Sequence, residues 1–251
     1  MKVSIVTISL NAKDTLRDTI ESVLEQSYSD IEYILIDGGS TDGSMDIIRE
    51  YEDKINLVVS EPDDGLYFAM NKGISMAIGD VIGILNADDT YSDTEVISKV
   101  VGKLKETGAD SLYGDLNYVQ RRDTDSVVRR WKSGQFKRNF FLKGWMVPHP
   151  TFFVKKWVYV KYGLFNTNLR TSADYEFMLR VLYKAKISTT YLEEVMVNMK
   201  MGGVSNGSLQ NRLRANKEDR LAWEINRLKP QALTFIRKPF RKLSQFLILK
   251  N

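Results

Sequence analysis

Residues 81–90 read Val-Ile-Gly-Ile-Leu-Asn-Ala-Asp-Asp-Thr and decide how the rest of the chain is interpreted. The apolar, β-branched first half predicts a buried strand, which ends in two adjacent carboxylates, Asp88 and Asp89. Ligands of open α/β sheets bind outside the carboxyl ends of the strands, so this pair is placed to hold a divalent cation against phosphate oxygens. The alternative is a solvated turn in which Asp89 caps the next helix.

On the amino-terminal side of this stretch, predicted strands alternate with segments of helical periodicity. Strands are predicted at residues 2–10, 31–36, 55–60 and 81–85, and helices at 16–24, 45–51 and 66–77. This alternation predicts right-handed βαβ units. We therefore expect an α/β fold with a single, mostly parallel, Rossmann-like sheet flanked by helices.

On the carboxyl-terminal side the pattern is less regular. The sequence predicts a helix at 96–105, strands at 111–118 and 126–131, irregular structure over a pocket at 136–153, a helix at 173–183 and a helical tail from 209. We divide the chain accordingly into residues 1–90, 91–207 and 208–251.

Composition limits the chemistry. With 43% hydrophobic and 27% charged residues, the 251-residue chain is typical of soluble globular proteins. No cysteine and a single histidine exclude disulfides and thiolate metal sites, so oxygen ligands must hold any metal, which favours Mg²⁺ or Mn²⁺. The sequence shows no signal peptide and no run of membrane-spanning length, which predicts a cytoplasmic protein.

The tail carries the positive charge. From Lys200 onward there are twelve basic and three acidic residues, a net charge of +9, which leaves −5 for residues 1–199. Apolar positions in the tail are spaced as two helix faces: Leu209, Leu213, Leu221, Ile225 and Leu228, then Leu233, Ile236, Phe240, Leu243 and Leu247. Such a basic amphipathic segment predicts contact with an anionic membrane surface. The alternative is packing on the domain or on a second subunit of a homo-oligomer; no nucleic-acid-reading motif accompanies the charge.

Two further turns follow predicted strands. Residues 37–43 read Asp-Gly-Gly-Ser-Thr-Asp-Gly, in which Asp37 could accept hydrogen bonds from a nucleobase that the glycines allow close to the backbone. The acidic turn with Asp63 and Asp64 could bind a ribose or a metal, and Asn71 and Lys72 on the next helix a phosphate. The alternatives are a capped βα turn and a solvated helix residue.

The order of these motifs resembles that of family 2 glycosyltransferases, which have a GT-A fold. The resemblance runs through the first half of the chain and rests on Asn11, Asp37-Gly38-Gly39-Ser40-Thr41-Asp42-Gly43, Asp63-Asp64-Gly65, Asn71-Lys72-Gly73 and Asn86-Ala87-Asp88-Asp89. It implies that Thr7, Asn11 and Asp37 bind the nucleobase of a nucleotide-sugar donor. It also implies that the aspartate cluster holds the ribose and a metal on the diphosphate.

One position departs from the family pattern. The family often shows Asp-x-Asp, whereas this chain has the neutral Asn86 first. Asn86 can hydrogen-bond a ribose hydroxyl but adds no charge to a metal site. We therefore assign the metal mainly to Asp88 and secondly to Asp89.

The second half carries a candidate base. Residues 171–180 read Thr-Ser-Ala-Asp-Tyr-Glu-Phe-Met-Leu-Arg and resemble the family motif in which an aspartate at a helix start is the catalytic base. Asp174 takes that position, and Ala173 stands where a glutamate is frequent. An inverting transfer needs such a base within hydrogen-bond reach of the acceptor hydroxyl. The alternative is a helix residue favoured by the helix dipole.

The single histidine, His149, is flanked by Pro148 and Pro150 in an aromatic-rich stretch. Its place is similar to that of a histidine in related transferases, so it is a candidate contact to the diphosphate or the acceptor. Trp145 is a candidate floor for a sugar. For both residues the alternative is a structural role in the core.

The resemblance implies an inverting, metal-dependent glycosyltransferase that uses Mn²⁺ or Mg²⁺. Its donor would be a nucleotide-diphosphate sugar, in particular a UDP-sugar, bound by residues 1–90. Its acceptor would be a glycan or a lipid-linked sugar, bound by residues 91–207. Such a protein would act in cell-surface polysaccharide or glycolipid synthesis, in the cytoplasm or peripherally on the inner face of the membrane.

Two other functions compete with this one. A sugar-nucleotide pyrophosphorylase shares the sheet type and the metal, but it predicts a loop rich in glycine and basic residues after the first strand. Residues 9–14, Ser-Leu-Asn-Ala-Lys-Asp, lack that composition. An inactive nucleotide- or membrane-binding module is the second competitor, and Asn86 and Ala173 are the residues that favour it.

Overall fold

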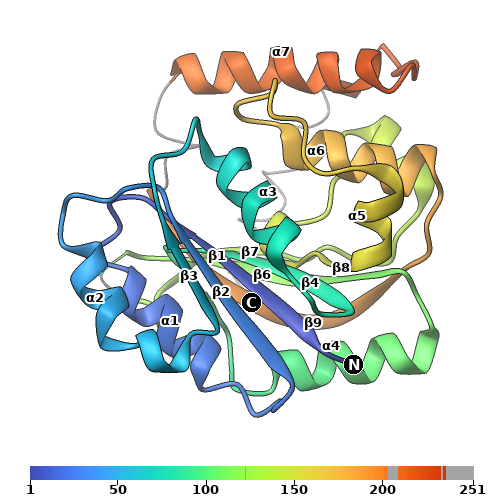
Figure 1. The fold of residues 1–251 in the computed structure, drawn as a ribbon. Helices are drawn as coiled ribbons and strands as arrows, with labels where there is room; N and C mark the ends of the chain where they lie inside the picture. The colour runs from blue at the N-terminus through green and yellow to red at the C-terminus, as the bar shows by residue number, and fades with distance from the viewer. Residues whose placement is uncertain (122, 203–208, 233, 236–251) are drawn as a thin grey trace.

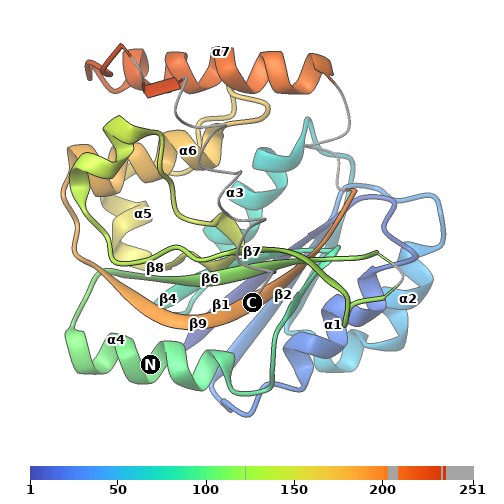
Figure 2. The same ribbon diagram turned by 180° about the vertical axis from the view of Figure 1, so that it is seen from behind.

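The computed structural model describes residues 1–121, 123–202, 209–232 and 234–235. A twisted sheet forms the middle layer of the molecule. Helices α1, α2 and α4 cover one face of it, and α3, α5, α6 and α7 lie on the other side, with α7 outermost (Figure 1, Figure 2).

The first half forms parallel strands joined by helices, as predicted. In chain order the elements are β1 (Val3–Ser9), α1 (Leu16–Leu24), β2 (Ile31–Asp37), α2 (Ser44–Glu50), the 3-10 turn η1 (Glu52–Lys54), β3 (Leu57–Ser60), α3 (Leu66–Met76) and β4 (Val81–Asn86). Strands β1, β2 and β4 are almost entirely buried because helices cover both faces of the sheet, which explains their continuous apolar sequences.

The second half is less regular. Its elements are β5 (Asp89–Tyr91), α4 (Val96–Thr107), β6 (Ser111–Val119), β7 (Val127–Trp131), the 3-10 helices η2 (Arg138–Lys143) and η3 (His149–Thr151), β8 (Phe153–Lys155), α5 (Lys156–Tyr162), α6 (Ala173–Met178), its π-helical continuation η4 (Leu179–Lys184), β9 (Thr189–Lys200) and α7 (Leu209–Ile225). The predicted irregular stretch at 136–153 therefore contains two short 3-10 helices.

The strand order is β3-β2-β1-β4-β8-β6-β9-β5, and β7 pairs with β6. Strands β1 to β4 pair in parallel, as do β6 and β9. Strand β8 is antiparallel to both of its neighbours, β5 to β9 and β7 to β6. Six strands thus run one way and three the other, so the sheet is mostly parallel, as predicted.

One hydrophobic core lies on each face of the sheet. The core beneath α1, α2 and α4 contains Leu16, Ile48 and Val100, among others. The opposite core is aromatic-rich and joins α3, α5, α6 and α7 through residues such as Met70 and Phe177. This second core lies beneath the segments that carry the candidate site.

The tail helix α7 packs differently from the prediction. From Leu213 onward, the buried side chains of α7 are Glu218, Asp219, Ala222 and Trp223, followed by Asn226 just after the helix, whereas Leu213, Leu221 and Ile225 are 70%, 38% and 41% exposed. Hydrogen bonds stabilise polar atoms on the buried side: Trp223 Nε1 donates to the Tyr175 hydroxyl, and Asn226 Nδ2 donates to Glu176 Oε1. Of the predicted apolar face, Leu213, Leu221 and Ile225 are thus exposed, whereas Leu228 packs against the aromatic-rich core.

The second predicted face of the tail, from Leu233 to Leu247, lies outside the described residues except for positions 234 and 235. Among the residues that the structure describes, no helix is long and apolar enough to cross a membrane.

Candidate active site

The parallel register brings the ends of four strands to one edge of the sheet. Ser9 at the end of β1 is level with Asp37 of β2, and Asp37 is level with Ser60 of β3. On the other side of β1, Ile8 is level with Asn86, the last residue of β4. The predicted donor-site residues Asp37 and Asn86 therefore lie on either side of the end of β1.

The buried carboxylate of Asp37 closes the turn that follows β2. It accepts hydrogen bonds from the Gly39 N–H (3.1 Å), the Ser40 N–H (2.9 Å), the Ser40 hydroxyl and the Ser60 hydroxyl (2.8 Å). Gly39 has a φ of +81° and packs against Pro62, so the turn needs a residue without a side chain there. Three of these donors bind Oδ2 and the Ser40 hydroxyl binds Oδ1, so Asp37 stabilises the turn, and its contact with a nucleobase stays a prediction.

Asn11 joins this turn to the end of β1. The Asn11 N–H donates to Ser40 Oγ (2.8 Å), and the Thr41 N–H donates to Asn11 Oδ1 (2.9 Å). Thr7 lies deeper, because it is fully buried within β1 and its hydroxyl accepts a hydrogen bond from the Tyr33 hydroxyl (3.2 Å). Asn11 thus lies at the edge of the sheet, whereas Thr7 does not reach it.

The acidic turn and helix α3 form one ion-pair cluster. Lys72 Nζ lies 2.6 Å from Asp63 Oδ1 and 2.7 Å from Glu61 Oε1, and these carboxylates raise the pKa of Lys72. The second oxygen of Asp63 is buried and has no partner among the described residues. Asp64 is exposed. Lys72 is therefore a partnered cation beside the strand edge rather than a solvated helix residue.

Asn71 has a structural contact that the sequence did not reveal. Its Nδ2 donates to the Phe165 carbonyl (2.9 Å), and its Oδ1 accepts from the Phe165 N–H (2.9 Å). This two-way bond ties α3 to the loop that leads into α6. The predicted phosphate contact of Asn71 would have to compete with it.

The corner after β4 contains unpaired oxygens. Asn86 Nδ2 donates to Asp89 Oδ2 (3.2 Å), while Asn86 Oδ1 and Asp89 Oδ1 are buried without a partner in the part of the chain described. Burial raises the pKa of Asp88, and burial together with the charge of Asp88 raises that of Asp89 well above its usual value. Asp88 is half-buried and Asp89 fully buried, so Asp88 is the more accessible carboxylate.

These oxygens fit a hard divalent cation. No three acidic or histidine side chains within the described ranges are grouped closely enough to hold a metal by themselves. Mg²⁺ and similar cations are, however, commonly bound by one or two carboxylates together with substrate phosphates. Two carboxylates and an amide oxygen, two of the three with an unpaired buried atom, match that partial donor set.

Lys200 is a charged residue at this corner that sequence reasoning missed. It is 3% exposed at the end of β9, and its Nζ forms an ion pair with Asp18 of α1. Its charge lowers the pKa values of Asp88 and Asp89, against the effect of burial. A buried ammonium thus supports the ionised state of the aspartate pair. Its position depends on the pairing of β9 with β5, which no local pattern in the sequence indicates.

Asp174 occupies the first turn of α6, as predicted, and is half-buried. The hydroxyl of Tyr67, at the start of α3, donates to Asp174 Oδ1 (3.0 Å). Burial and the charge of Asp174 raise the pKa of Tyr67 well above its usual value, so the phenol stays a hydrogen-bond donor. Because α3 follows the turn at the end of β3, this contact places Asp174 on the carboxyl-edge side of the sheet.

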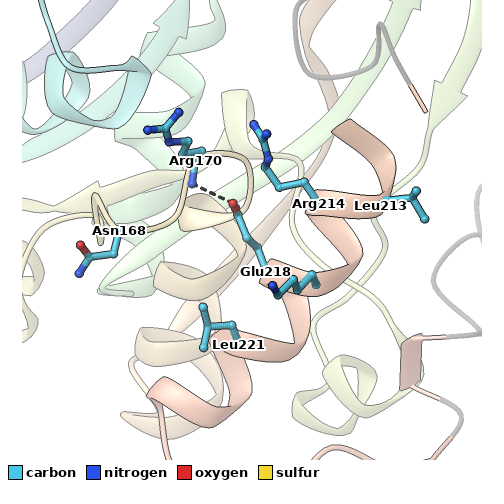
Figure 3. A pocket seen from close by; sticks show the side chains of 7 residues that line it. Asn168, Arg170, Leu213, Arg214, Glu218 and Leu221 are labelled. Atoms are coloured by element: carbon cyan, nitrogen blue, oxygen red, sulfur yellow. Dashed lines mark hydrogen bonds between the residues drawn. The ribbon is translucent and has the colours of Figure 1, made fainter. Parts of the chain in front are cut away.

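A carboxylate from α7 holds the segment before Asp174. Glu218 accepts hydrogen bonds from the N–H groups of Arg170 (3.1 Å), Thr171 (2.7 Å) and Ser172 (3.0 Å), and from the Thr171 hydroxyl (2.8 Å). Figure 3 shows the bond to Arg170. The first N–H groups of a helix have no partner within it, so Glu218 supplies acceptors that α6 and its entry loop lack.

The two remaining candidates differ in access. His149 is half-buried beside Phe165; burial lowers its pKa, and the charge of Asp174 opposes that shift. Trp145 is 4% exposed, donates from Nε1 to the Ser133 carbonyl (3.1 Å) and packs edge-on against Tyr113. The structure therefore places His149 near the candidate base and Trp145 in the core, so Trp145 does not form a floor for a sugar.

Comparison with known proteins agrees with this geometry. The family model described as "Glycosyl transferase family 2" matches residues 4–155. A relative from Mycobacterium tuberculosis named "PGL/p-HBAD biosynthesis glycosyltransferase" is 29% identical over 208 residues, which is 81% of this chain and 78% of the relative.

Solved structures match almost the whole chain. TarS of S. aureus in complex with UDP-GlcNAc superposes with a TM-score of 0.71 at 16% identity, over 98% of this chain and 72% of TarS. The mannosyltransferase PcManGT of Pyrobaculum calidifontis in complex with GDP-Man and Mn²⁺ has a TM-score of 0.67 at 18% identity, over 99% of this chain and 70% of that one. These likenesses confirm the predicted GT-A fold.

The first prediction concerns the carboxylate of Glu218. We expect Glu218→Ala to lower the free energy of unfolding by about 2–3 kcal/mol, because buried N–H groups lose their acceptor. Glu218→Gln, which keeps one oxygen, should lose less. Glu224→Ala, on the exposed side of α7, is the control and should change stability by no more than about 0.5 kcal/mol. Urea unfolding measures all three, and equal effects of Glu218→Ala and Glu224→Ala would contradict the account.

The second prediction is a pH dependence that the only histidine makes easy to assign. Since the folded-state pKa of His149 is below 6.5, the unfolded chain gains the proton first as the pH falls through 6.5. Wild type should therefore lose stability relative to His149→Gln between about pH 7 and 5, by at most about 1.4 kcal/mol per pH unit. Parallel pH profiles of the two proteins would show that His149 is not held neutral.

Proposed function

Because the chain belongs to glycosyl transferase family 2, we propose that it is an inverting glycosyltransferase in which Asp174 is the catalytic base. The observation that carries this proposal is the contact between Tyr67 and Asp174 (3.0 Å). It joins the candidate base on α6 to the helix that follows the donor-side turn. A base held at a fixed angle in this way can meet an acceptor hydroxyl on the face opposite the leaving group.

We propose a nucleotide-diphosphate sugar, in particular a UDP-sugar, as the donor. The TarS complex with UDP-GlcNAc supports a uridine nucleotide, whereas the PcManGT complex contains GDP-Man. In this proposal the nucleotide lies over the strand edge formed by Asn11 and the 37–43 turn. We assign Asn86 and the turn with Asp63 and Asp64 to the ribose, and Lys72 to the phosphates.

Asp88 is the proposed principal metal ligand, with Asp89 and the Asn86 amide oxygen beside it. A bound Mn²⁺ or Mg²⁺ would offset the negative charge of the leaving diphosphate. The chain's own contribution is the charge of Lys200, which opposes the effect of burial on the pKa values of both carboxylates, and two buried oxygens that have no partner among the described residues. PcManGT was solved with Mn²⁺, which supports this choice of metal.

The reaction is proposed to run in one displacement. Asp174 removes the proton from the acceptor hydroxyl while the hydroxyl oxygen forms a bond to the anomeric carbon. The bond from that carbon to the diphosphate breaks, and its electron pair stays on the nucleotide diphosphate. Tyr67 donates to Asp174 Oδ1, which orients the carboxylate and leaves Oδ2 to take the proton. His149, whose pKa burial lowers, is a neutral neighbour in this step.

The proposed acceptor is a glycan or a lipid-linked sugar of cell-surface polysaccharide or glycolipid synthesis. Such an acceptor would place the enzyme at the cytoplasmic face of a membrane. The pyrophosphorylase alternative loses support because the family match includes the first strand and both turns. An inactive module is the remaining alternative, and the experiments below exclude it if donor turnover is found.

Replacing the base is the test of mechanism. Asp174→Asn should reduce the rate of sugar transfer by about 10²- to 10⁴-fold, because no carboxylate receives the proton. The rate of donor hydrolysis, measured without acceptor, should fall by a similar factor. Donor binding should remain, as measured by thermal stabilisation with the nucleotide sugar. Asp125→Asn, an exposed carboxylate near the β6–β7 hairpin, is the control and should keep full activity. An active Asp174→Asn protein would remove Asp174 from the mechanism.

Replacing the corner residues tests the metal assignment. Stabilisation by a saturating UDP-sugar should reach about 2.7 kcal/mol at a hundredfold excess over Kd, and the gain should depend on Mn²⁺. Asp88→Asn should abolish the Mn²⁺-dependent part, whereas Asn86→Ala should only weaken donor binding because the amide carries no charge. Thermal unfolding of both variants with a panel of nucleotide sugars, with and without Mn²⁺, makes the comparison. Stronger stabilisation by a purine nucleotide would refute the uridine assignment.

A further inference from the structure

A pocket of about 550 Å³ lies between α7 and the loop that leads into α6 (Figure 3). Three cationic side chains line it: Arg170 from the loop, and Arg214 and Lys217 from α7. Figure 3 shows Arg170 and Arg214 on the same side of the Glu218 carboxylate, with their guanidinium groups projecting in the same direction. We call this the α7 pocket.

The α7 pocket has a net positive charge, because the cations Arg170, Arg214 and Lys217 line it together with one carboxylate, that of Glu218. None of the ion pairs between described residues involves Arg170, Arg214 or Lys217. Glu218 is the acidic residue that lines the pocket, and three N–H groups and a hydroxyl of residues 170–172 already occupy its two oxygens. The guanidinium groups of Arg170 and Arg214 are suited to a phosphate, because guanidinium N–H donors can form several hydrogen bonds to its oxygens.

The same pocket has an apolar wall. Leu213 and Leu221 line it and are 70% and 38% exposed, while the acidic Glu218 and Asp219 of the same helix are buried against the protein. The leucine and cationic side chains of α7 that line the pocket therefore lie on the same, outer side of the helix. A ligand that satisfies both needs an anionic group joined to a hydrocarbon chain.

The α7 pocket is connected to the proposed base through the loop that leads into α6. Glu218, which lines it, binds the Thr171 and Ser172 N–H groups, and Asp174 follows two residues after Ser172. The donor nucleotide is proposed at the strand edge, so we assign an anionic group bound beside this loop to the acceptor. A phosphate attached to the acceptor sugar would lie here when the sugar hydroxyl faces Asp174.

We propose that the α7 pocket binds the phosphate of a lipid-linked acceptor, with Arg170 and Arg214 on the phosphate and Leu213 and Leu221 along the lipid chain. This inference rests on the proposed function, because it assigns a substrate class to the same active site. It makes α7 part of the acceptor site through its outer side chains, as well as a support for α6 through Glu218.

A second pocket provides a matched control. It has a volume of about 570 Å³ and also combines cations with apolar side chains, among them Lys156, Trp157 and Val160. It lies beside Asp80, at the amino-terminal end of β4, and so at the opposite end of the strand from Asn86. Substitutions there change similar chemistry at a site remote from Asp174.

Binding of three soluble probes tests the proposal on the full chain: farnesyl phosphate, farnesol and inorganic phosphate, measured by calorimetry below micelle-forming concentrations. Farnesyl phosphate should bind at least about tenfold more tightly than either fragment, because it uses both walls. The double variant Arg170→Ala, Arg214→Ala should bind farnesyl phosphate about tenfold or more weakly than wild type. The double variant Leu213→Ser, Leu221→Ser should bind farnesyl phosphate more weakly but inorganic phosphate with unchanged affinity. The control double variant, Lys156→Ala, Trp157→Ser, should bind farnesyl phosphate and inorganic phosphate with the affinities of wild type.

Two results would overturn the assignment. Equal binding of farnesyl phosphate and inorganic phosphate, or equal losses in the α7 and control variants, would show that the α7 pocket is not an acceptor site. Binding of phosphatidylglycerol vesicles that depends on Arg170 and Arg214, but is not displaced by farnesyl phosphate, would assign the surface to bulk membrane lipid instead.

UDP binding separates this proposal from the function on which it rests. If wild type is stabilised by UDP in the presence of Mn²⁺ but does not prefer farnesyl phosphate, only the acceptor assignment fails. If no nucleotide stabilises the protein, the proposed function itself fails. Retention of UDP stabilisation in the arginine and leucine variants would also show that they are folded.

Discussion

Parallel hydrogen bonding of β1 with β2 and β4 is the constraint on which the rest of the structure depends. It fixes Ser9, Asp37 and Asn86 at one edge of the sheet, where every following turn must begin. Side chains that are polar and end a buried strand can be tolerated only at such an edge, since burial without a partner is costly. The candidate site therefore lies at the carboxyl edge, and the second half of the chain has to reach that edge to contribute to it.

The second half reaches the edge through polar contacts rather than through a regular layer. The Asn71 side chain forms two hydrogen bonds with the Phe165 backbone, and Glu218 accepts hydrogen bonds from the backbone of residues 170–172. The Tyr67 hydroxyl donates a hydrogen bond to Asp174. Each contact uses a group that would be costly to bury alone, so together they hold the α6 start in one position. Helix α7, whose buried side is rich in polar residues, thus holds the start of α6 in place through Glu218.

Much of the first half could be predicted from the sequence because its periodicity is local. The strands before Asp37 and Asn86, and the helix start at Asp174, follow from apolar spacing and turn residues. The contacts of Asn71 with Phe165 and of Glu218 with Thr171 could not be predicted, because the partners are 94 and 47 residues apart. Apolar spacing also did not predict which side of α7 is buried, because it cannot show that Glu218 and Asn226 form hydrogen bonds when they are buried. The sequence makes Trp145 a candidate for a sugar site because it does not show that Trp145 is buried among aromatic residues such as Tyr113 and Phe141.

The central claim is that Asp174 activates an acceptor for direct attack on the anomeric carbon of a donor held at the carboxyl edge. The most direct test is the configuration of the sugar released when water replaces the acceptor. With an α-linked UDP-sugar and Mn²⁺, proton NMR recorded before mutarotation should show the β-anomer first, because a single displacement inverts the centre. First appearance of the α-anomer would require a different mechanism and would contradict the account.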